Sequence, residues 1–551
     1  MSYASYLSYW VLWNGPPQLD HNWPFTHIQF DLKWPGSYSN LPEPCVVLQL
    51  DRKSLTPLYT QIVAEIRRMI TGGTLKVGDR LPANRELAKT LGVNRNTVTT
   101  AYAELTAQGL ITSRVGSGTY ISAIPQATSS PLKTHEKASS PMSWESLLSV
   151  QSRDSWLQEM SSLDSTRDAI SLSLALPSAD LFPLDEFRRC VDTVLRRQGR
   201  VLLQLGTTSG YPPLQEYIAG QLALSGVCVS PDEVLITNGC QQSLDLIRQI
   251  LVGPADEVAV ENPTYPGALS VFCSSNSKYL SVPVDSHGID LNVLEDVLSQ
   301  RRPKLIYVVP SFHNPTGATM DAASRLRLIG IAERYRVPIV EDDIYRELRY
   351  DGPDVSPVKA LDEQGLVIYI SSFSKVGFPG LRVGWIAAPR IVIDHLNRAK
   401  QRCDLHASLL AQAAIYEFAR RGLLAKHIKR VKKAYSERRD AMLYSLQKHF
   451  PDESSWSQPD GGMSVWVRLP DSLSSRQLLI QAVESGVTFI SGDNFYSSSP
   501  QQNMMRLSFT MATPQAIEEA VKRLGTLMKA RLVRIKKRRA QDRTDGLRAL
   551  V

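Results

Sequence analysis

The chain has 551 residues, of which 43% are hydrophobic and 21% are charged, and its formal net charge is +8. This composition is ordinary for a globular protein, and the length predicts roughly two to four domains. It excludes a wholly disordered chain, and no apolar stretch reaches the length of about 18 residues that a membrane span needs.

The positive charge is concentrated near the two ends of the chain. Residues 529–551 carry nine Lys or Arg and two Asp, and residues 51–120 carry ten basic and five acidic side chains. This pattern favours a polyanionic partner, most simply nucleic acid, although the segment 529–551 alone could be a solvated basic tail. The scattered cysteines and the lack of a secretory signal predict a reduced, cytoplasmic protein with no metal site and no membrane segment.

Residues 1–50 follow neither a helical nor a strand period. They contain Trp10, Trp13, Trp23 and Trp34 among Pro, Asn, Ser and Gly. Two interpretations stay open. The segment is either an extension that docks on the body of the protein, or the product of a start read too early, since recognisable structure begins near Leu48.

Residues 51–122 are expected to form a DNA-binding domain of three helices and a β-hairpin. The recurrence of Leu58, Ile62, Ile66 and Ile70 gives the first helix one apolar face. A second helix is expected at about 84–90, and a third at 95–107 after Asn94 as N-cap. Strands at 110–112 and 119–121 flank a glycine turn. This order predicts a winged helix-turn-helix whose third helix enters the major groove of DNA.

Polar residues on the second and third helices and on the wing are the expected contacts with double-stranded DNA. Side chains at the start of the third helix can reach base edges, and those of the second helix and the wing can reach phosphates. The candidates are Arg85, Arg95, Asn96, Thr97, Thr99, Arg114, Gly116, Ser117 and Gly118.

This segment resembles the GntR family of bacterial regulators. The resemblance is carried by the stretches PLYTQI (57–62), LPANRELAKTLGVNRNTV (81–98), AYAEL (101–105) and RVGSGTY (114–120). The family usually has Ser where Ala83 and Asn84 stand. The cap of the second helix is therefore expected to be Asn84 or to be weak.

Residues 123–165 are rich in Ser, Pro, Thr and Lys and are predicted to be a flexible linker. From 166 to 528, apolar runs alternate with helical segments, which predicts an α/β domain with a mainly parallel sheet. The runs lie at 234–236, 257–260, 305–309, 339–340 and 367–370, and later strands are expected at 463–468 and 505–509. In such a sheet the active site lies at the carboxyl ends of the strands.

Several polar turns follow these strands. Lys375, in the Ser-rich turn 371–375, is placed to form a Schiff base with an aldehyde cofactor, and Arg382 and nearby hydroxyls suit its phosphate. Asp342, after the run 339–340, suits a pyridoxal ring nitrogen, and Asn314 and Tyr345 suit its phenolate oxygen. The turn 237–242 begins a helix, where backbone N–H groups cradle phosphate.

Together these turns resemble the aspartate-aminotransferase-like, fold-type-I family of pyridoxal-phosphate proteins. The resemblance implies that Lys375 holds the cofactor, that Asp342 pairs with the ring nitrogen and that Tyr265 stacks on the ring. It implies a phosphate cup of Cys240, Gln241, Ser372, Ser374 and Arg382. Arg506 resembles the arginine that pairs with a substrate carboxylate, whereas His313 is interpreted as structural.

One position departs from that family. Its members usually carry a tyrosine that reaches the cofactor phosphate of the partner subunit, and Leu205 stands there instead. The resemblance therefore leaves turnover in doubt, because a hydrogen bond to a charged group contributes about 1.5–3 kcal/mol.

A GntR-type reader followed by an aminotransferase-like domain resembles the MocR subfamily, over about residues 51–528. The resemblance implies a homodimeric transcription regulator that binds promoter DNA and pyridoxal phosphate and senses an amine or amino acid. Two alternatives stay open. The protein could be a working aminotransferase that carries a DNA-binding domain, or a regulator that senses only free pyridoxal phosphate.

Overall fold

A computed structural model of the protein describes residues 48, 50, 52, 56–71, 74–114, 118–122, 169–273 and 276–548. They fall into two compact units, one within residues 1–144 and the other within 145–551. The expected linker at 123–165 and nearly all of the expected N-terminal extension lie outside the described residues. In the described part of the chain, no helix is long and apolar enough to cross a membrane.

The first unit is a winged helix-turn-helix, as the sequence predicts. Its helices are α1 (Leu58–Thr71), α2 (Asn84–Leu91) and α3 (Arg95–Ala107), and its antiparallel sheet has the order β1 (Arg80–Leu81), β3 (Gly118–Ile121), β2 (Ile111–Arg114). Ile62, Ile66 and Ile70 of α1 are buried in one hydrophobic cluster with Val98 and Leu105 of α3. Strand β1 is an element that the apolar pattern does not reveal, because it has only two residues.

The start of α2 has a weak cap, as one of the two expectations had it, and the cap residue is not Asn84. The N-cap is Ala83, which has no side-chain oxygen, and Asn84 is already the first helical residue. The carboxylate of Glu86 accepts a hydrogen bond from the backbone N–H of Ala83 at 3.3 Å, which satisfies one free donor at the helix end. At the other end Gly92 adopts φ 61°, a left-handed conformation that glycine tolerates, so the chain turns sharply into α3.

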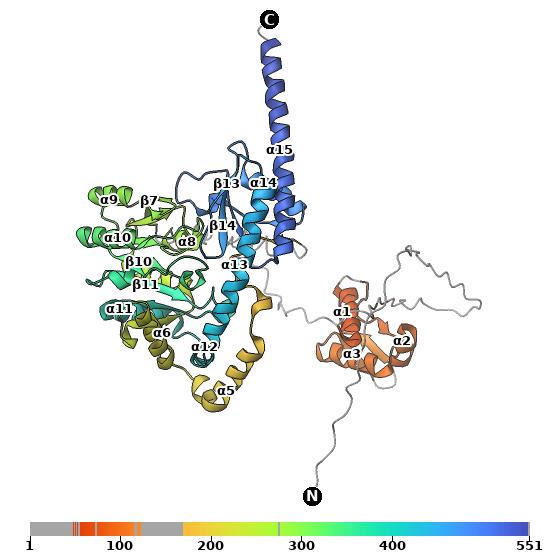
Figure 1. Ribbon diagram of the computed structural model, residues 1–551. Helices are drawn as coiled ribbons and strands as arrows, with labels where there is room; N and C mark the ends of the chain where they lie inside the picture. The colour runs from red at the N-terminus through yellow and green to blue at the C-terminus, as the bar shows by residue number, and fades with distance from the viewer. Residues whose placement is uncertain are drawn as a thin grey trace, which may run out of the picture. The chain divides into compact units, whose positions relative to one another are not determined.

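The second unit is built on an eight-stranded sheet with the order β5-β12-β11-β10-β9-β6-β7-β8. The strands from β11 to β7 in this order are parallel to one another, and β12 is antiparallel to both of its neighbours. Helices cover both faces of the sheet (Figure 1). The strands are β5 (Val234–Thr237), β6 (Glu257–Asn262), β7 (Lys278–Asp285), β8 (Gly288–Ile289), β9 (Leu305–Val308), β10 (Ile339–Asp342), β11 (Val367–Ser372) and β12 (Gly384–Ala387).

Helices alternate with most of the strands up to β10, as expected for an α/β unit, whereas no α-helix separates β10, β11 and β12. The helices are α5 (Leu184–Leu202), α6 (Pro212–Leu224), α7 (Cys240–Leu251), α8 (Pro266–Cys273), α9 (Leu291–Gln300), α10 (Ala322–Tyr335), α11 (Arg390–Asp404) and α12 (Leu409–Arg420). The central strands are buried on both sides, and β10 and β11 are buried at every residue. This burial explains why they are continuous apolar runs in the sequence.

The C-terminal part of this unit forms a smaller sheet packed with long helices. The sheet has the order β13 (Ser455–Trp456), β14 (Ser464–Arg468), β17 (Met504–Ser508), β16 (Ile490–Ser491), and a separate parallel pair joins β15 (Val487–Thr488) to β4 (Ile170–Ser171). Its helices are α13 (Leu423–His449), α14 (Ser475–Glu484) and α15 (Pro514–Arg548), and α15 extends beyond the small sheet (Figure 1).

The basic segment that begins at residue 529 is not a separate tail. It continues α15 without interruption to Arg548. The physical reason is its composition, because residues 529–540 are mostly Lys, Arg, Leu and Ala and contain neither Pro nor Gly.

Candidate cofactor site and DNA-binding surface

Lys375 lies just after the end of β11 in buried surroundings. Its Nζ donates a hydrogen bond to the backbone oxygen of Ala175 at 2.7 Å and lies 5.8 Å from the centre of the Tyr345 ring. Burial, followed by the nearby positive charge of Arg506, lowers the pKa of Lys375 to about 8. A buried amine with a lowered pKa has a larger neutral fraction near neutral pH, and the neutral form is the nucleophile.

Asp342, the last residue of β10, has one carboxylate oxygen that needs a partner. Its Oδ2 accepts a hydrogen bond from the Tyr307 hydroxyl at 2.8 Å, whereas Oδ1 is buried and has no hydrogen-bond partner among the described residues. Burial raises the pKa of Asp342 to about 7. An unpaired buried acceptor is costly, so the site fits a ligand that brings a cationic N–H donor, such as a protonated pyridine ring.

The turn before α7 and the loop after β11 approach each other closely. A Cβ atom at Gly239 would lie 2.6 Å from Nη2 of Arg382, so the guanidinium packs directly against this turn. Helix α7 begins at Cys240, and its first backbone N–H groups have no intrahelical acceptor. The hydroxyl of Ser372 accepts a hydrogen bond from the backbone N–H of Ser374 at 2.9 Å. A helix N-terminus beside an arginine suits a phosphate group.

Arg506, in β17, is buried and held by two residues. Its Nη1 donates to Oδ1 of Asn314 at 2.9 Å, and its Nη2 donates to the backbone oxygen of Ser173 at 2.7 Å. Its Nε has no partner among the described residues. Burial lowers the pKa of Arg506, which marks the cost of holding this cation without a carboxylate.

Tyr265, which follows β6, contacts the start of α7. Its hydroxyl donates to Oε1 of Gln241 at 3.3 Å, and Nε2 of Gln241 donates to the backbone oxygen of Gly267 at 3.1 Å. Burial raises the pKa of Tyr265 to about 12, and the charges of Asp342 and Arg506 also act on it. Residues that are far apart in the sequence are thus brought to one place.

Three contacts of this site were not expected from the sequence. The Tyr307 hydroxyl reaches Asp342 from inside β9, and the backbone oxygens of Ser173 and Ala175 hold Arg506 and Lys375. The only feature of the sequence that could have indicated the role of Tyr307 is a hydroxyl in an otherwise apolar strand. A contact made by a backbone oxygen leaves no feature in the sequence.

His313 belongs to a buried network beside the site. Its Nε2 lies 3.2 Å from Oε2 of Glu261, and its Nδ1 lies 2.8 Å from Oγ1 of Thr316. These contacts join β6 to the turn that carries Asn314, which agrees with the structural interpretation of His313.

The candidate DNA-binding residues of α2 and α3 lie at the surface of the first unit. Arg85, Arg95 and Asn96 are exposed, and Thr97 is half-buried. Oγ1 of Thr99 is occupied, because it accepts a hydrogen bond from Asn84 Nδ2 at 3.2 Å and donates to the backbone oxygen of Arg95 at 3.0 Å. Gly118 begins β3 with φ 116°. The side chain of Arg114 and the residues Gly116 and Ser117 lie outside the described part of the structure.

Comparisons with known proteins match both units. Residues 58–121 match the bacterial regulatory proteins of the gntR family, and residues 180–524 match the aminotransferase class I and II family. The chain is 33% identical over 480 residues to the probable rhizopine catabolism regulatory protein MocR of Rhizobium meliloti, covering 87% of this chain and 95% of that protein. It is 38% identical over 379 residues to aromatic-amino-acid aminotransferase 1 of Thermococcus litoralis, covering 68% of this chain and 91% of that protein.

Solved structures agree with these matches. The α-aminoadipate aminotransferase of Thermus thermophilus, complexed with N-(5'-phosphopyridoxyl)-L-leucine, superposes with a TM-score of 0.67 at 35% identity, covering 71% of this chain and 100% of that chain. The chain therefore belongs to the aminotransferase class I and II family and joins that fold to a GntR-type DNA-binding domain, as in MocR-type regulators. Its cofactor is pyridoxal phosphate.

Proposed function

We propose that the protein is a DNA-binding transcription regulator whose aminotransferase-like unit holds pyridoxal phosphate and senses an amine or amino acid. The observation that carries this proposal is the presence, in one chain, of a GntR-type winged helix and of the half-buried Lys375 with the buried Asp342 and Arg506. An aminotransferase does not need a winged helix, and a regulator that only binds DNA does not need Lys375, Asp342 and Arg506 in this arrangement.

In this proposal each group of the site has one task. Lys375 would hold the cofactor through Nζ, and Oδ1 of Asp342 would accept a hydrogen bond from the protonated ring nitrogen. Arg382 and the first N–H groups of α7 bind the phosphate, and Tyr265 packs on the ring. The bound cofactor supplies an aldehyde carbon that reacts with amines and a ring that withdraws electrons.

Arg506 is the proposed receptor for an effector carboxylate. Its guanidinium is planar and already oriented by Asn314 and Ser173, so a carboxylate could pair with it in the two-bond geometry that arginine favours. An amine effector without a carboxylate would not use this residue. The response of the protein to amino acids should therefore depend on Arg506, whereas the binding of the cofactor should not depend on Arg506.

An effector amine would compete with Lys375 for the aldehyde carbon that the bound cofactor supplies, and a carboxylate paired with Arg506 would change the contacts of β17. Both changes favour one arrangement of the unit over another, and a ligand shifts such an equilibrium only by its difference in affinity for the two arrangements. Coupling free energies between sites are typically about 1–3 kcal/mol.

A second candidate function, a working aminotransferase, is favoured by the lowered pKa of Lys375. At about 8, this pKa leaves some neutral amine near neutral pH, and Nζ could then move a proton during catalysis. Leu205, in the position where relatives usually carry a tyrosine, argues against efficient turnover.

The deciding experiment measures the binding of the full-length holoprotein to a duplex that it selects from a random pool, with and without amino acids. We expect an amino acid to change the affinity, Arg506→Ala to abolish that change while keeping the cofactor, and Lys375→Ala to fix the affinity at one value. Steady conversion of an amino acid to a keto acid over many turnovers, with DNA affinity indifferent to every amine, would establish the aminotransferase instead.

The role of Lys375 has its own test. Borohydride reduction of the wild-type protein, followed by peptide mapping, should place the cofactor on Lys375, with the buried Lys400 of α11 as the internal control. Cofactor found on another lysine would contradict the assignment.

We further propose that the protein is a homodimer through α5 and the segment after it. Val201, Leu203 and Leu205 are 69–78% exposed, and Leu184 at the start of α5 is 67% exposed. Several large apolar side chains exposed on one element are typical of an interface. A twofold dimer would also supply the two reader domains that tight operator binding needs.

A further inference from the structure

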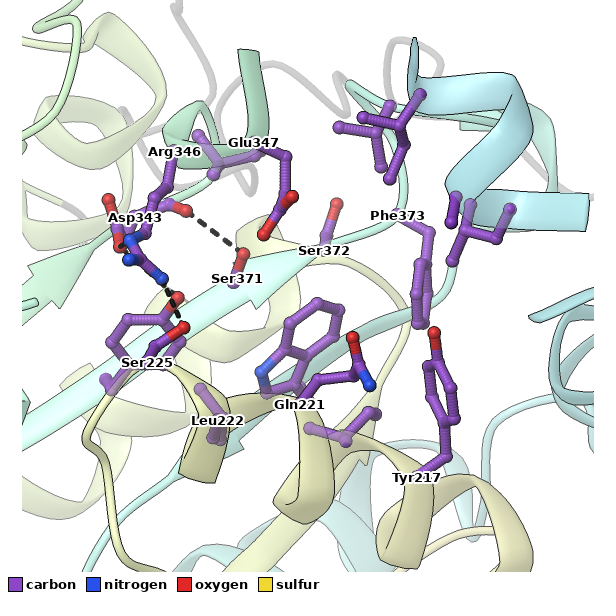
Figure 2. A pocket seen from close by; sticks show the side chains of 18 of the residues that line it. Tyr217, Gln221, Leu222, Ser225, Asp343, Arg346, Glu347, Ser371, Ser372 and Phe373 are labelled. Carbon is purple, nitrogen blue, oxygen red and sulfur yellow. Dashed lines mark hydrogen bonds and ion pairs between the residues drawn. The ribbon is translucent and has the colours of Figure 1, made fainter. Parts of the chain in front are cut away.

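A pocket lies between the strands that carry the candidate cofactor site and the helices α6 and α13. Successive side chains of a strand point to opposite faces of the sheet. Ile368 and Ile370 of β11 belong to one hydrophobic cluster, whereas Tyr369 and Phe373 belong to another, on the side of α6. The pocket opens on the second side and is lined by Asp343, Ser371 and Ser372 (Figure 2). Asp343 follows the candidate cofactor-site residue Asp342 in the chain, and Ser372 is itself one of the candidate phosphate-binding residues.

The pocket is large enough for a small molecule. Its volume is about 400 Å³. This value lies within the range of about 300–1,000 Å³ that is usual for ligand sites. Tyr217 and Leu222 of α6 form one wall and Ile428 of α13 another. Trp385 of β12 lies against Phe373, with ring centres 4.9 Å apart. These side chains make a slot for a flat or branched apolar group.

One polar atom in the wall of this slot needs a partner. Nε1 of Trp385 is buried and has no hydrogen-bond partner among the described residues. An indole N–H can only donate. A ligand that carries an acceptor oxygen would therefore satisfy it.

Charged side chains of both signs line the pocket. Glu347 points into it from η5 (Arg346–Leu348) (Figure 2), and Lys429 and Lys432 line it from α13. Within the described part of the chain, none of these three lies within 4.0 Å of an oppositely charged side-chain atom, although the charges of Arg346 and Lys432 act on Glu347. Arg346 is different, because it donates to Ser225 and, at 2.6 Å, to Asp354. Arg346 therefore belongs to the wall, and Glu347 and the two lysines are left to meet a ligand.

We propose that this pocket is a second small-molecule site, for a zwitterion of the size of an aromatic amino acid. Glu347 would take the ammonium group, Lys429 and Lys432 the carboxylate, and Phe373 and Tyr217 the apolar side chain. A carboxylate oxygen would also accept the hydrogen bond that Nε1 of Trp385 lacks. The site does not depend on the roles proposed for Lys375 and Arg506. Because Ser371 and Ser372 are neighbours in β11, its occupant would act on the cofactor site through one strand end.

The test uses the full-length holoprotein after borohydride reduction, so that the cofactor no longer reacts with amines. Isothermal titration calorimetry should find saturable binding of L-phenylalanine. Phenethylamine, which lacks the carboxylate, and 3-phenylpropionate, which lacks the amine, should each bind at least about tenfold more weakly, since each loses one charge-assisted contact. Absence of saturable binding of L-phenylalanine, or equal binding of all three probes, would overturn the proposal.

Variants of one helix separate this pocket from other places on the protein. Gln221 of α6 lines the pocket and is exposed, so Gln221→Trp should fill the mouth and abolish the binding of L-phenylalanine without disturbing the core. Leu224, at the end of the same helix, is 83% exposed and does not line the pocket, so Leu224→Trp should leave the affinity within about twofold.

Glu347→Gln tests the charge. It should weaken L-phenylalanine by about tenfold and leave 3-phenylpropionate unchanged, because only the ammonium group loses its partner. Binding that survives Gln221→Trp, or that Glu347→Gln does not weaken, would place the ligand elsewhere and overturn the proposal.

Discussion

The buried ionisable residues of the cofactor site have pKa values displaced toward neutrality. Asp342 rises to about 7 and Lys375 falls to about 8, in both cases mainly because burial penalises the charged form. Such groups reduce the stability of the cofactor-free protein. In the proposed function their partner is the cofactor, which would offset this loss of stability in the bound state.

Asp342→Asn should stabilise the cofactor-free protein, and more at pH 8 than at pH 5. A folded-state pKa raised from 3.8 to about 7 means that the folded protein binds the proton more tightly than the unfolded chain does. The cost is therefore absent at low pH, grows as the pH rises from about 4, and is complete above about 7. Scanning calorimetry should record a gain of about 2–5 °C at pH 8.

The control is Asp471→Asn, which changes an 83% exposed side chain and should leave the midpoint unchanged at both pH values. In the cofactor-loaded protein the sign should reverse, since the neutral amide of the Asp342→Asn variant cannot neutralise a protonated ring. An equal shift at both pH values would show that burial of the Asp342 charge is not the cause.

At the scale of elements, helix ends position both functional surfaces. Helix α7 begins at the turn that packs against Arg382. Helix α3 begins just after its N-cap Asn94, whose Oδ1 accepts a hydrogen bond from the backbone N–H of Asn96 at 2.9 Å. Because Arg95 is the first residue after this cap, the cap also determines the position of Arg95. Helix α2 lacks a side-chain cap, so α3 is the better anchored of the two reader helices.

Asn94→Ala should therefore loosen the start of α3. Loss of an N-cap costs about 1 kcal/mol, so the first amides of α3 should exchange with solvent about fivefold faster. Hydrogen exchange of the full-length protein, read by mass spectrometry, measures this. Asn96→Ala removes an exposed side chain from the same turn but leaves the cap, and it should not accelerate exchange. Equal acceleration in both variants would contradict the capping role of Asn94.

At the scale of the whole molecule, a basic DNA reader is joined to a unit with exposed apolar surface at α5. The DNA-binding unit supplies charge for a polyanion, and the exposed apolar side chains of the larger unit are the proposed surface for a second copy. Neither property is enough alone, because a single small reader binds DNA weakly and pairing two readers raises the effective concentration of the second.

Leu203→Glu should convert the dimer to a monomer. The substitution places a charge on a side chain that is 71% exposed in one chain and that would be buried between two. Light scattering at micromolar concentration measures the mass. Ile480→Glu, on the 63% exposed Ile480 of α14, is the matched control and should stay dimeric. A wild-type protein of monomeric mass would refute the proposed dimer.

Arg85→Ala should weaken binding to all DNA sequences and flatten its salt dependence. Each phosphate contact that is lost lowers the slope of log K against log salt by about 0.9, hence by about twice that for a dimer. The slope is obtained from binding measured at several salt concentrations. Arg68→Ala, on α1, removes another exposed arginine, one that pairs with Glu65 at 2.8 Å, and serves as the control. An unchanged slope in Arg85→Ala would remove Arg85 from the interface.

Local sequence patterns were sufficient to predict the fold class. The apolar face of α1 and the continuous apolar runs of β10 and β11 follow from periodicity and burial alone, and both are present. Patterns fail where an element is too short or a composition is ambiguous. Strand β1 has only two residues, too few to show a period. The composition of the basic segment after 528 suits a solvated tail as well as a helix, and in the structure it continues α15.

What the sequence determined by itself is the order of helices and strands and the polar turns that follow them, because periodicity and turn chemistry act between near neighbours. Only the tertiary structure decided which atoms of those turns have partners. Tyr307 satisfies one oxygen of Asp342 and leaves the other free, and Asn314 and Ser173 orient Arg506. These contacts join segments far apart in the chain, and no local rule reports them, because they depend on how separate strands are brought side by side.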